Sequence, residues 1–195
     1  THIGRSENVL VMRLFITVLV LIFSFQSWIK ADDITDFEIE GMSIGDSALD
    51  FFSESEIKNH KQSSQYPNDK FIIRNFYLHK NFETYEMVTV NHKKNDKKYI
   101  IESLGASIFF DDIKECFTRK KDIISEFDQI FKNSDKESGQ IKKSFDKTGN
   151  SLSDITEYYL SKGSLVQVTC DNWSEVLEQK GFKDSLNVNL QSKKF

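Results

Sequence analysis

An apolar run near the start of the chain limits what the remaining residues can fold into. Leu14 to Phe25 is a run of twelve residues that follows Arg13, and the small residue Ala31 precedes an acidic pair. One positive charge, a short apolar core and a small residue at the cleavage point are typical of a secretory signal peptide. A membrane-spanning helix needs about 20 apolar residues, so the run is short for one. We therefore expect a signal peptide over residues 12–31, cleaved after Ala31.

The signal peptide divides the chain into parts with different fates. Residues 1–11 precede the first methionine, Met12, and we expect them to be upstream read-through. Residues 32–195 have the size of a single domain. Within them, the polar and turn-rich stretch 134–151 is the candidate for an internal boundary. An uncleaved signal that anchors the chain to a membrane stays open as an alternative.

The charge of the exported chain argues against nucleic acid as a partner. The whole chain has 26 basic and 30 acidic residues, and its net charge is −4 at pH 7. Loss of residues 1–31 leaves 23 basic and 29 acidic residues and a net charge of −6. Nucleic-acid binders need a basic field. We expect an envelope protein or a small molecule as the partner, and membrane contact only through an uncleaved signal.

The two cysteines, Cys116 and Cys170, both lie in the exported part of the chain. In an oxidising compartment an even pair of cysteines is typical of a disulfide. Two cysteines so far apart, without paired histidines, make a poor zinc site, and the chain has no Cys-x-x-Cys redox motif. We therefore predict a Cys116–Cys170 disulfide, and we predict no metal and no cofactor.

Hydrophobic periodicity predicts an α+β fold. Asp112 can cap a long amphipathic helix over 112–133, whose apolar positions include Cys116 and Phe117. We expect the partner of Cys116 to lie in the sheet beneath that helix. β-rich runs on either side of polar turns predict hairpins over 85–104 and 155–170. Together these elements predict an antiparallel sheet built from hairpins, packed against one long helix and one or two short helices.

Shorter elements complete the prediction. Strands are expected over 36–41, 71–78 and 186–190, and a short helix over 48–59. Gly105 lies inside a strand-like run that ends at Phe110, and a glycine in such a place suggests a β-bulge.

One motif raises the question of catalysis. Gly45-Asp46-Ser47 is similar to the nucleophile block of GDS-type esterases, in which a histidine from an Asp-x-x-His motif activates the serine. The chain contains no Asp-x-x-His. Aspartate and serine are also good helix caps, which explains the motif without catalysis. A hydrolase that uses Ser47 is the disfavoured alternative, and no catalytic residue is assigned.

Trp173, with Asn172 beside it, follows a predicted buried strand. An indole next to an amide can contact a ligand, although most tryptophans in such places pack against the core or its rim. We take Trp173 and Asn172 as the candidate ligand contacts.

Two segments resemble known exported proteins. DITDFEIEGMSIGDSALD, from Asp33 to Asp50, and VTCDNW, from Val168 to Trp173, resemble small secreted or periplasmic proteins of AT-rich marine alphaproteobacteria. The motifs of that group are not tied to a reaction, so the resemblance implies export and a bacterial source and assigns no catalytic residue. The resulting hypothesis is a periplasmic or secreted protein that acts as a non-catalytic binding or envelope-accessory module.

Overall fold

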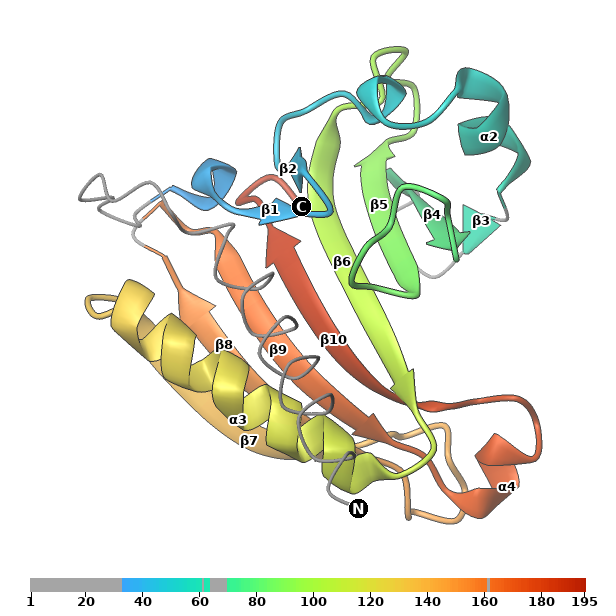
Figure 1. Ribbon diagram of the computed structural model, residues 1–195, viewed down its shortest axis with the longest axis vertical. Coiled ribbons are helices and arrows are strands. Elements are labelled where there is room, and N and C mark those ends of the chain that lie inside the picture. The colour runs from blue at the N-terminus through green and yellow to red at the C-terminus, as the bar shows by residue number, and fades with distance from the viewer. Residues whose placement is uncertain (1–32, 61, 64–69, 161) are drawn as a thin grey trace, which may run out of the picture. The chain divides into compact units, whose positions relative to one another are not determined.

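An eight-stranded antiparallel sheet, in the order β3-β4-β5-β6-β10-β9-β8-β7, organises the protein (Figure 1). The computed structural model describes residues 33–60, 62–63, 70–160 and 162–195, so the expected signal peptide over 12–31 and residues 1–11 lie outside the described residues. The strands of the sheet are β3 (Gln62–Ser63), β4 (Phe71–Tyr77), β5 (Met87–Lys93), β6 (Ile101–Phe110), β7 (Asp135–Lys142), β8 (Leu152–Tyr159), β9 (Leu165–Asn172) and β10 (Asp184–Gln191). The predicted α+β class is confirmed.

The two faces of the sheet differ in chemistry because successive side chains of a strand point to opposite sides. Register places Val188 of β10 between Ala106 of β6 and Val168 of β9, so apolar side chains line up across one face. The sheet contributes these apolar residues to the core: Phe76, Val88, Val90, Leu104, Ala106, Ile108, Val166, Val168, Leu186, Val188 and Leu190. The residues between them point to the other face and are mostly small and polar.

Helix α3 (Ile113–Ile130) packs on the apolar face, mainly across β9 and β10. Its N-cap is Asp112, as predicted, whose side chain accepts a hydrogen bond from the Lys114 amide. The predicted buried stripe is wrong at one position, because Phe117 is 39% exposed. Lys120, which the apolar pattern omits, is buried instead. The face of α3 that packs on the sheet therefore includes one charged side chain, Lys120, four residues after Cys116.

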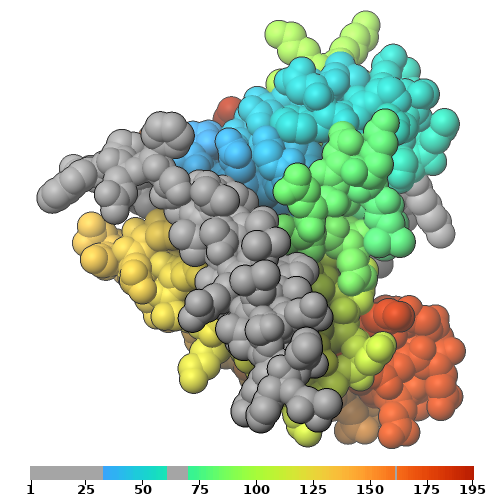
Figure 2. Space-filling view, in the orientation of Figure 1, coloured from blue at the N-terminus to red at the C-terminus, as the bar shows by residue number. Residues whose placement is uncertain are grey.

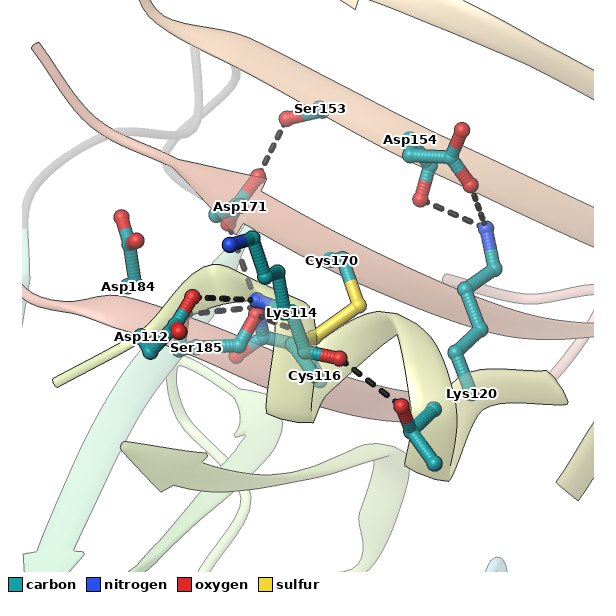
Figure 3. The surroundings of a disulfide bond; sticks show 12 residues. Asp112, Lys114, Cys116, Lys120, Ser153, Asp154, Cys170, Asp171, Asp184 and Ser185 are labelled. Carbon is teal, nitrogen blue, oxygen red and sulfur yellow. Dashed lines mark hydrogen bonds and ion pairs between the residues drawn. A yellow bond between two sulfur atoms is a disulfide. The ribbon is translucent and has the colours of Figure 1, made fainter. Parts of the chain in front are cut away.

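The predicted disulfide is confirmed, and it joins α3 to the sheet beneath. Cys116 and Cys170 are both fully buried, and their Cα atoms are 6.0 Å apart (Figure 3). One helical turn further on, Lys120 Nζ donates hydrogen bonds to the backbone oxygen of Asp154, at 2.7 Å, and to its carboxylate. The helix is thus fixed to β9 by a covalent bond and to β8 by a partly buried ion pair.

The N-terminal elements contact the same face of the sheet. They comprise the 3₁₀ helices η1 (Ile34–Asp36) and η2 (Ala48–Asp50), the hairpin of β1 (Glu38–Ile39) and β2 (Met42–Ser43), and α2 (Glu54–Asn59). The predicted strand over 36–41 is therefore shorter, and the predicted helix over 48–59 is divided. A capping box between Ser53 and Glu56 starts a new helix at Glu54. Phe52 stacks on Phe76 of β4, with ring centroids 3.8 Å apart.

The predicted β-bulge at Gly105 is wrong. Gly105 pairs regularly with Thr89 on β5 and Asn189 on β10, and the register shift lies between Asn91 and His92. A Cβ atom at position 105 would collide with the Asn189 side-chain oxygen. Glycine leaves room here for the Asn189 side chain to lie over the backbone, and the strand does not bulge.

Residues 134–151, the candidate internal boundary, contain a strand of the same sheet. β7 pairs with β8 through all eight of its residues, and every one of them is exposed. A longer turn follows at 143–151, and a hydrogen bond from the Lys143 amide to the Ser151 carbonyl closes it. The stretch is polar because it forms the sheet edge and the turn after it.

Candidate ligand-binding site

The face of the sheet opposite α3 carries a polar cleft of about 230 Å³. Five adjacent strands, β5, β6, β10, β9 and β8, supply its lining. The lining residues are Met87, Thr89, Gly105, Ala106, Ser107, Lys143, Ser153, Ile155, Gln167, Thr169, Asp171, Asn187 and Asn189. Because side chains alternate along each strand, the strands that build the apolar core on one side place most of these polar groups on the other.

Side-chain amides in the cleft are held by hydrogen bonds between neighbouring strands. Asn187 Oδ1 accepts from Ser107 Oγ at 2.6 Å, and Asn187 Nδ2 donates to Asp171 Oδ2 at 3.1 Å. Gln167 Nε2 donates to Glu157 Oε1 at 2.7 Å, while its oxygen accepts from Asn189 Nδ2 at 3.4 Å. Each amide has further hydrogen-bonding capacity, so the network orients donors and acceptors without exhausting them.

The two charged groups of the cleft neutralise each other. Lys143 Nζ lies 2.9 Å from Asp171 Oδ1, and the two side chains are 24% and 15% exposed. Ser153 Oγ and Asn187 Nδ2 also donate to the Asp171 carboxylate. The cleft therefore presents mainly neutral hydroxyl and amide groups, with one ion pair at its border.

Thr169 has a buried hydroxyl without a partner among the described residues. It is 6% exposed, and register places it between Ile155 of β8 and Asn187 of β10 in the lining of the cleft. Thr169 Oγ1 makes no hydrogen bond within the described part of the chain. A buried polar group left unsatisfied costs roughly 1–3 kcal/mol, so this hydroxyl is a cost to the fold that a ligand group could relieve.

An aromatic cluster of Phe145, Trp173 and Phe182 adjoins the cleft. The Trp173 ring centroid is 4.8 Å from that of Phe182 and 6.0 Å from that of Phe145. Phe145 is 58% exposed and Phe182 is 39% exposed. Lys143 connects the cluster to the cleft, because its Nζ lies 5.0 Å from the centre of the Trp173 ring as well as beside Asp171.

Three chain segments meet at this cluster: the turn at 143–151, the end of β9, and the loop between α4 (Glu175–Glu178) and β10. In Figure 1 the connection between β7 and β8 lies beside α4. The α4 segment, orange-red at the lower right of Figure 2, forms part of the molecular surface.

Buried polar groups hold these segments together. Asp146 accepts hydrogen bonds from the Ser151 hydroxyl, at 2.6 Å, and from the Ser151 amide, at 2.9 Å. The Ser151 hydroxyl in turn accepts from the Ser174 amide at 2.9 Å. The Ser151 hydroxyl, with additional donors from Thr148, holds the pKa of the Asp146 carboxyl well below its ordinary value. The turn that carries Phe145 is thus joined to the residue that follows Trp173.

A second carboxylate fixes Trp173 itself. The Trp173 amide donates to Asp184 Oδ1 at 2.8 Å. Burial, together with the carboxylates of Asp112 and Asp171, raises the pKa of the Asp184 carboxyl above its ordinary value. The aromatic cluster is therefore held in place by the backbone around it, and not by ring contacts alone.

The predicted ligand contacts have different positions. Trp173 is half-buried, and its cluster borders the cleft. Asn172 shares the orientation of Cys170 along β9, so it belongs to the face of the sheet that α3 covers. Ser47, the serine of the disfavoured hydrolase, is the N-cap of η2: its Oγ donates to the Lys98 carbonyl at 2.7 Å and accepts from the Leu49 amide. Its hydroxyl proton is directed at a backbone oxygen.

The cleft residues themselves were not predicted, although the strands contain a signal for them. In β9 and β10 the polar positions hold Gln167, Thr169, Asn187 and Asn189, instead of the lysine and glutamate common on solvated strands. Within the described ranges, no three His, Cys, Asp or Glu side chains gather as metal ligands.

Comparison with known proteins found no relative of this chain. No known protein family matches the chain, and no curated protein or solved structure matches it.

Proposed function

We propose that this chain is an exported binding protein without catalysis, and that its cleft binds one saccharide unit, a small, neutral and hydroxyl-rich solute. The observation that carries the proposal is the unpartnered hydroxyl of Thr169, buried in a cleft lined by amides and hydroxyls. The ligand would supply the hydrogen bond that this hydroxyl lacks.

The chemistry of the lining favours a saccharide over charged or apolar ligands. A sugar hydroxyl both donates and accepts, and so do the amides of Gln167, Asn187 and Asn189. Phosphate and carboxylate ligands are bound by forked arginine contacts or uncompensated positive charge, whereas Lys143 is paired with Asp171. Lipids require a mainly apolar lining. A cleft of about 230 Å³ is smaller than the pockets that hold drug-sized molecules, and this size favours a single sugar ring.

Several features support export to the periplasm or the cell exterior. The chain carries a disulfide between buried cysteines, which is compatible with an oxidising compartment. The predicted signal peptide and the resemblance to secreted bacterial proteins point the same way. A binding role also agrees with the structural use of the Ser47 hydroxyl as a helix cap.

Paired threonine variants test the proposal. Thr169→Val removes the unpartnered hydroxyl and nearly preserves shape. Thr156→Val is the control on the opposite face, where Thr156 is 5% exposed and its hydroxyl lies 3.1 Å from Ser138 Oγ. Nuclear magnetic resonance titrations with glucose, galactose, mannose and N-acetylglucosamine should shift amide signals of the cleft strands in the wild-type protein. We expect Thr169→Val to weaken this binding by about tenfold, which corresponds to one lost hydrogen bond, and Thr156→Val to leave it unchanged.

The same titrations can refute the proposal. If none of the four sugars shifts the signals of β6, β9 and β10, the cleft does not bind a saccharide unit. Equal binding by the wild-type protein and Thr169→Val would show that the hydroxyl has no part in recognition.

A further inference from the structure

The exposed aromatic cluster of Phe145, Trp173 and Phe182 is not used by a single sugar in the cleft. Exposed apolar groups rimmed by polar residues mark interaction sites. Here the rim is the cleft itself, because Lys143 contacts both the Trp173 ring and Asp171. A ligand in the cleft that extends past Lys143 would meet these rings next.

We infer that the natural ligand is a neutral oligosaccharide, and that the aromatic cluster stacks against a sugar unit adjoining the one in the cleft. This inference rests on the proposed function. A sugar ring has apolar C–H faces and a polar rim of hydroxyls. An aromatic surface beside a row of amides and hydroxyls is complementary to both parts of such a ligand.

The cluster is prepared for stacking before a ligand arrives. The Trp173 amide is held by Asp184, and the turn that carries Phe145 is held through Asp146 and Ser151. The planes of Trp173 and Phe182 are tilted by 52°, and those of Phe145 and Phe182 by 35°. The rings therefore form an uneven surface on a backbone that is already held, which lowers the ordering cost of binding.

The continuity of the two surfaces favours a glycan over a protein or a membrane as the occupant. A membrane contact would not need the ordered amides of Asn187 and Gln167 next to the rings. Anionic lipid would also be repelled by a net charge of −6 over residues 32–195. A chain of linked sugars uses the amides and the rings at the same time.

Tryptophan fluorescence can test the cluster directly, because the chain has only two tryptophans, Trp28 and Trp173. In the full chain with Trp28→Phe, all tryptophan emission comes from Trp173. The probes are hexasaccharides of glucose, galactose, mannose and N-acetylglucosamine, together with the four monosaccharides. We expect at least one hexasaccharide to change the emission and to bind about tenfold more tightly than its monosaccharide.

A matched pair of phenylalanine variants isolates the contribution of the cluster. Phe182 and Phe117 are each 39% exposed, but Phe117 lies on α3, across the sheet from the cleft. In the Trp28→Phe background, Phe182→Ala should remove most of the tenfold gain and leave monosaccharide binding intact. Phe117→Ala should change neither. Phe145→Ala, at a position 58% exposed, provides a second variant that leaves the core untouched.

The outcomes separate this inference from the proposed function. If monosaccharides bind the cleft but no hexasaccharide binds more tightly, the aromatic subsite is refuted and the cleft proposal stands. Equal effects of Phe182→Ala and Phe117→Ala would also refute the subsite. If neither monosaccharides nor hexasaccharides bind, both proposals fail.

Discussion

Removal of the Cys116–Cys170 disulfide should lower the free energy of unfolding by about 4 kcal/mol. The two cysteines are 54 residues apart, and the chain-entropy relation converts a loop of that length into roughly this value. The bond encloses most of α3, all of β7 and β8, and most of β9. Because ordinary domains are stable by about 5–15 kcal/mol, the loss should remove a large part of the total.

Urea unfolding followed by circular dichroism can measure this loss. The double variant Cys116→Ala/Cys170→Ala removes the bond and two buried sulfur atoms, whereas chemical reduction of the wild-type protein removes only the bond. We expect reduction to account for most of the loss and the packing of the sulfur atoms for the remainder. A reduced protein within about 1 kcal/mol of the oxidised protein would contradict the loop-entropy argument.

Two further predictions concern buried charged or titratable groups. Asp154→Ala should destabilise the protein by about 1.5–3 kcal/mol, because it removes the counter-charge of the buried Lys120 ammonium but leaves its hydrogen bond to the Asp154 backbone oxygen. Lys120→Met should change stability by less than about 1 kcal/mol, and equal losses in urea unfolding would contradict this asymmetry. Burial lowers the pKa of His92 from its ordinary value of 6.5, so its contribution to stability is complete above pH 6.5 and falls as the pH drops below it, because only the unfolded chain takes up the proton. His92→Gln should flatten this decline below pH 6.5 when urea unfolding is measured at a series of pH values, and an unchanged slope in His92→Gln would show that another group causes it.

Features that depend on local chemistry could be predicted from the sequence. A pair of cysteines in an oxidising compartment is enough to predict a disulfide. An aspartate before a helical pattern is enough to predict an N-cap, because the first amides of a helix lack partners. The hairpin of β8 and β9 follows from two β-rich runs around a short polar turn. In each case a few neighbouring residues contain the whole physical reason for the structure.

Features that depend on tertiary contacts could not be predicted in this way. β7 has the sequence DKESGQIK and no apolar face, because it lies at the sheet edge and all its residues are exposed. Lys120 resembles a surface residue until Asp154 of another element is placed beside it. Gly105 looks like a bulge until Asn189 is seen to cross it. The cleft needs the order of five strands, which no local pattern contains.

The position of β10 has a consequence for the order of events in biogenesis. β10 is the last strand along the chain, yet it lies in the interior of the sheet, paired with β6 on one side and β9 on the other. The strands β3 to β6 and the strands β7 to β9 have no shared ladder until residues 184–191 arrive between them. The sheet can close only after residues 184–191 have left the ribosome. Until then, β6 and β9 each keep one edge unpaired, and the two groups of strands remain separate.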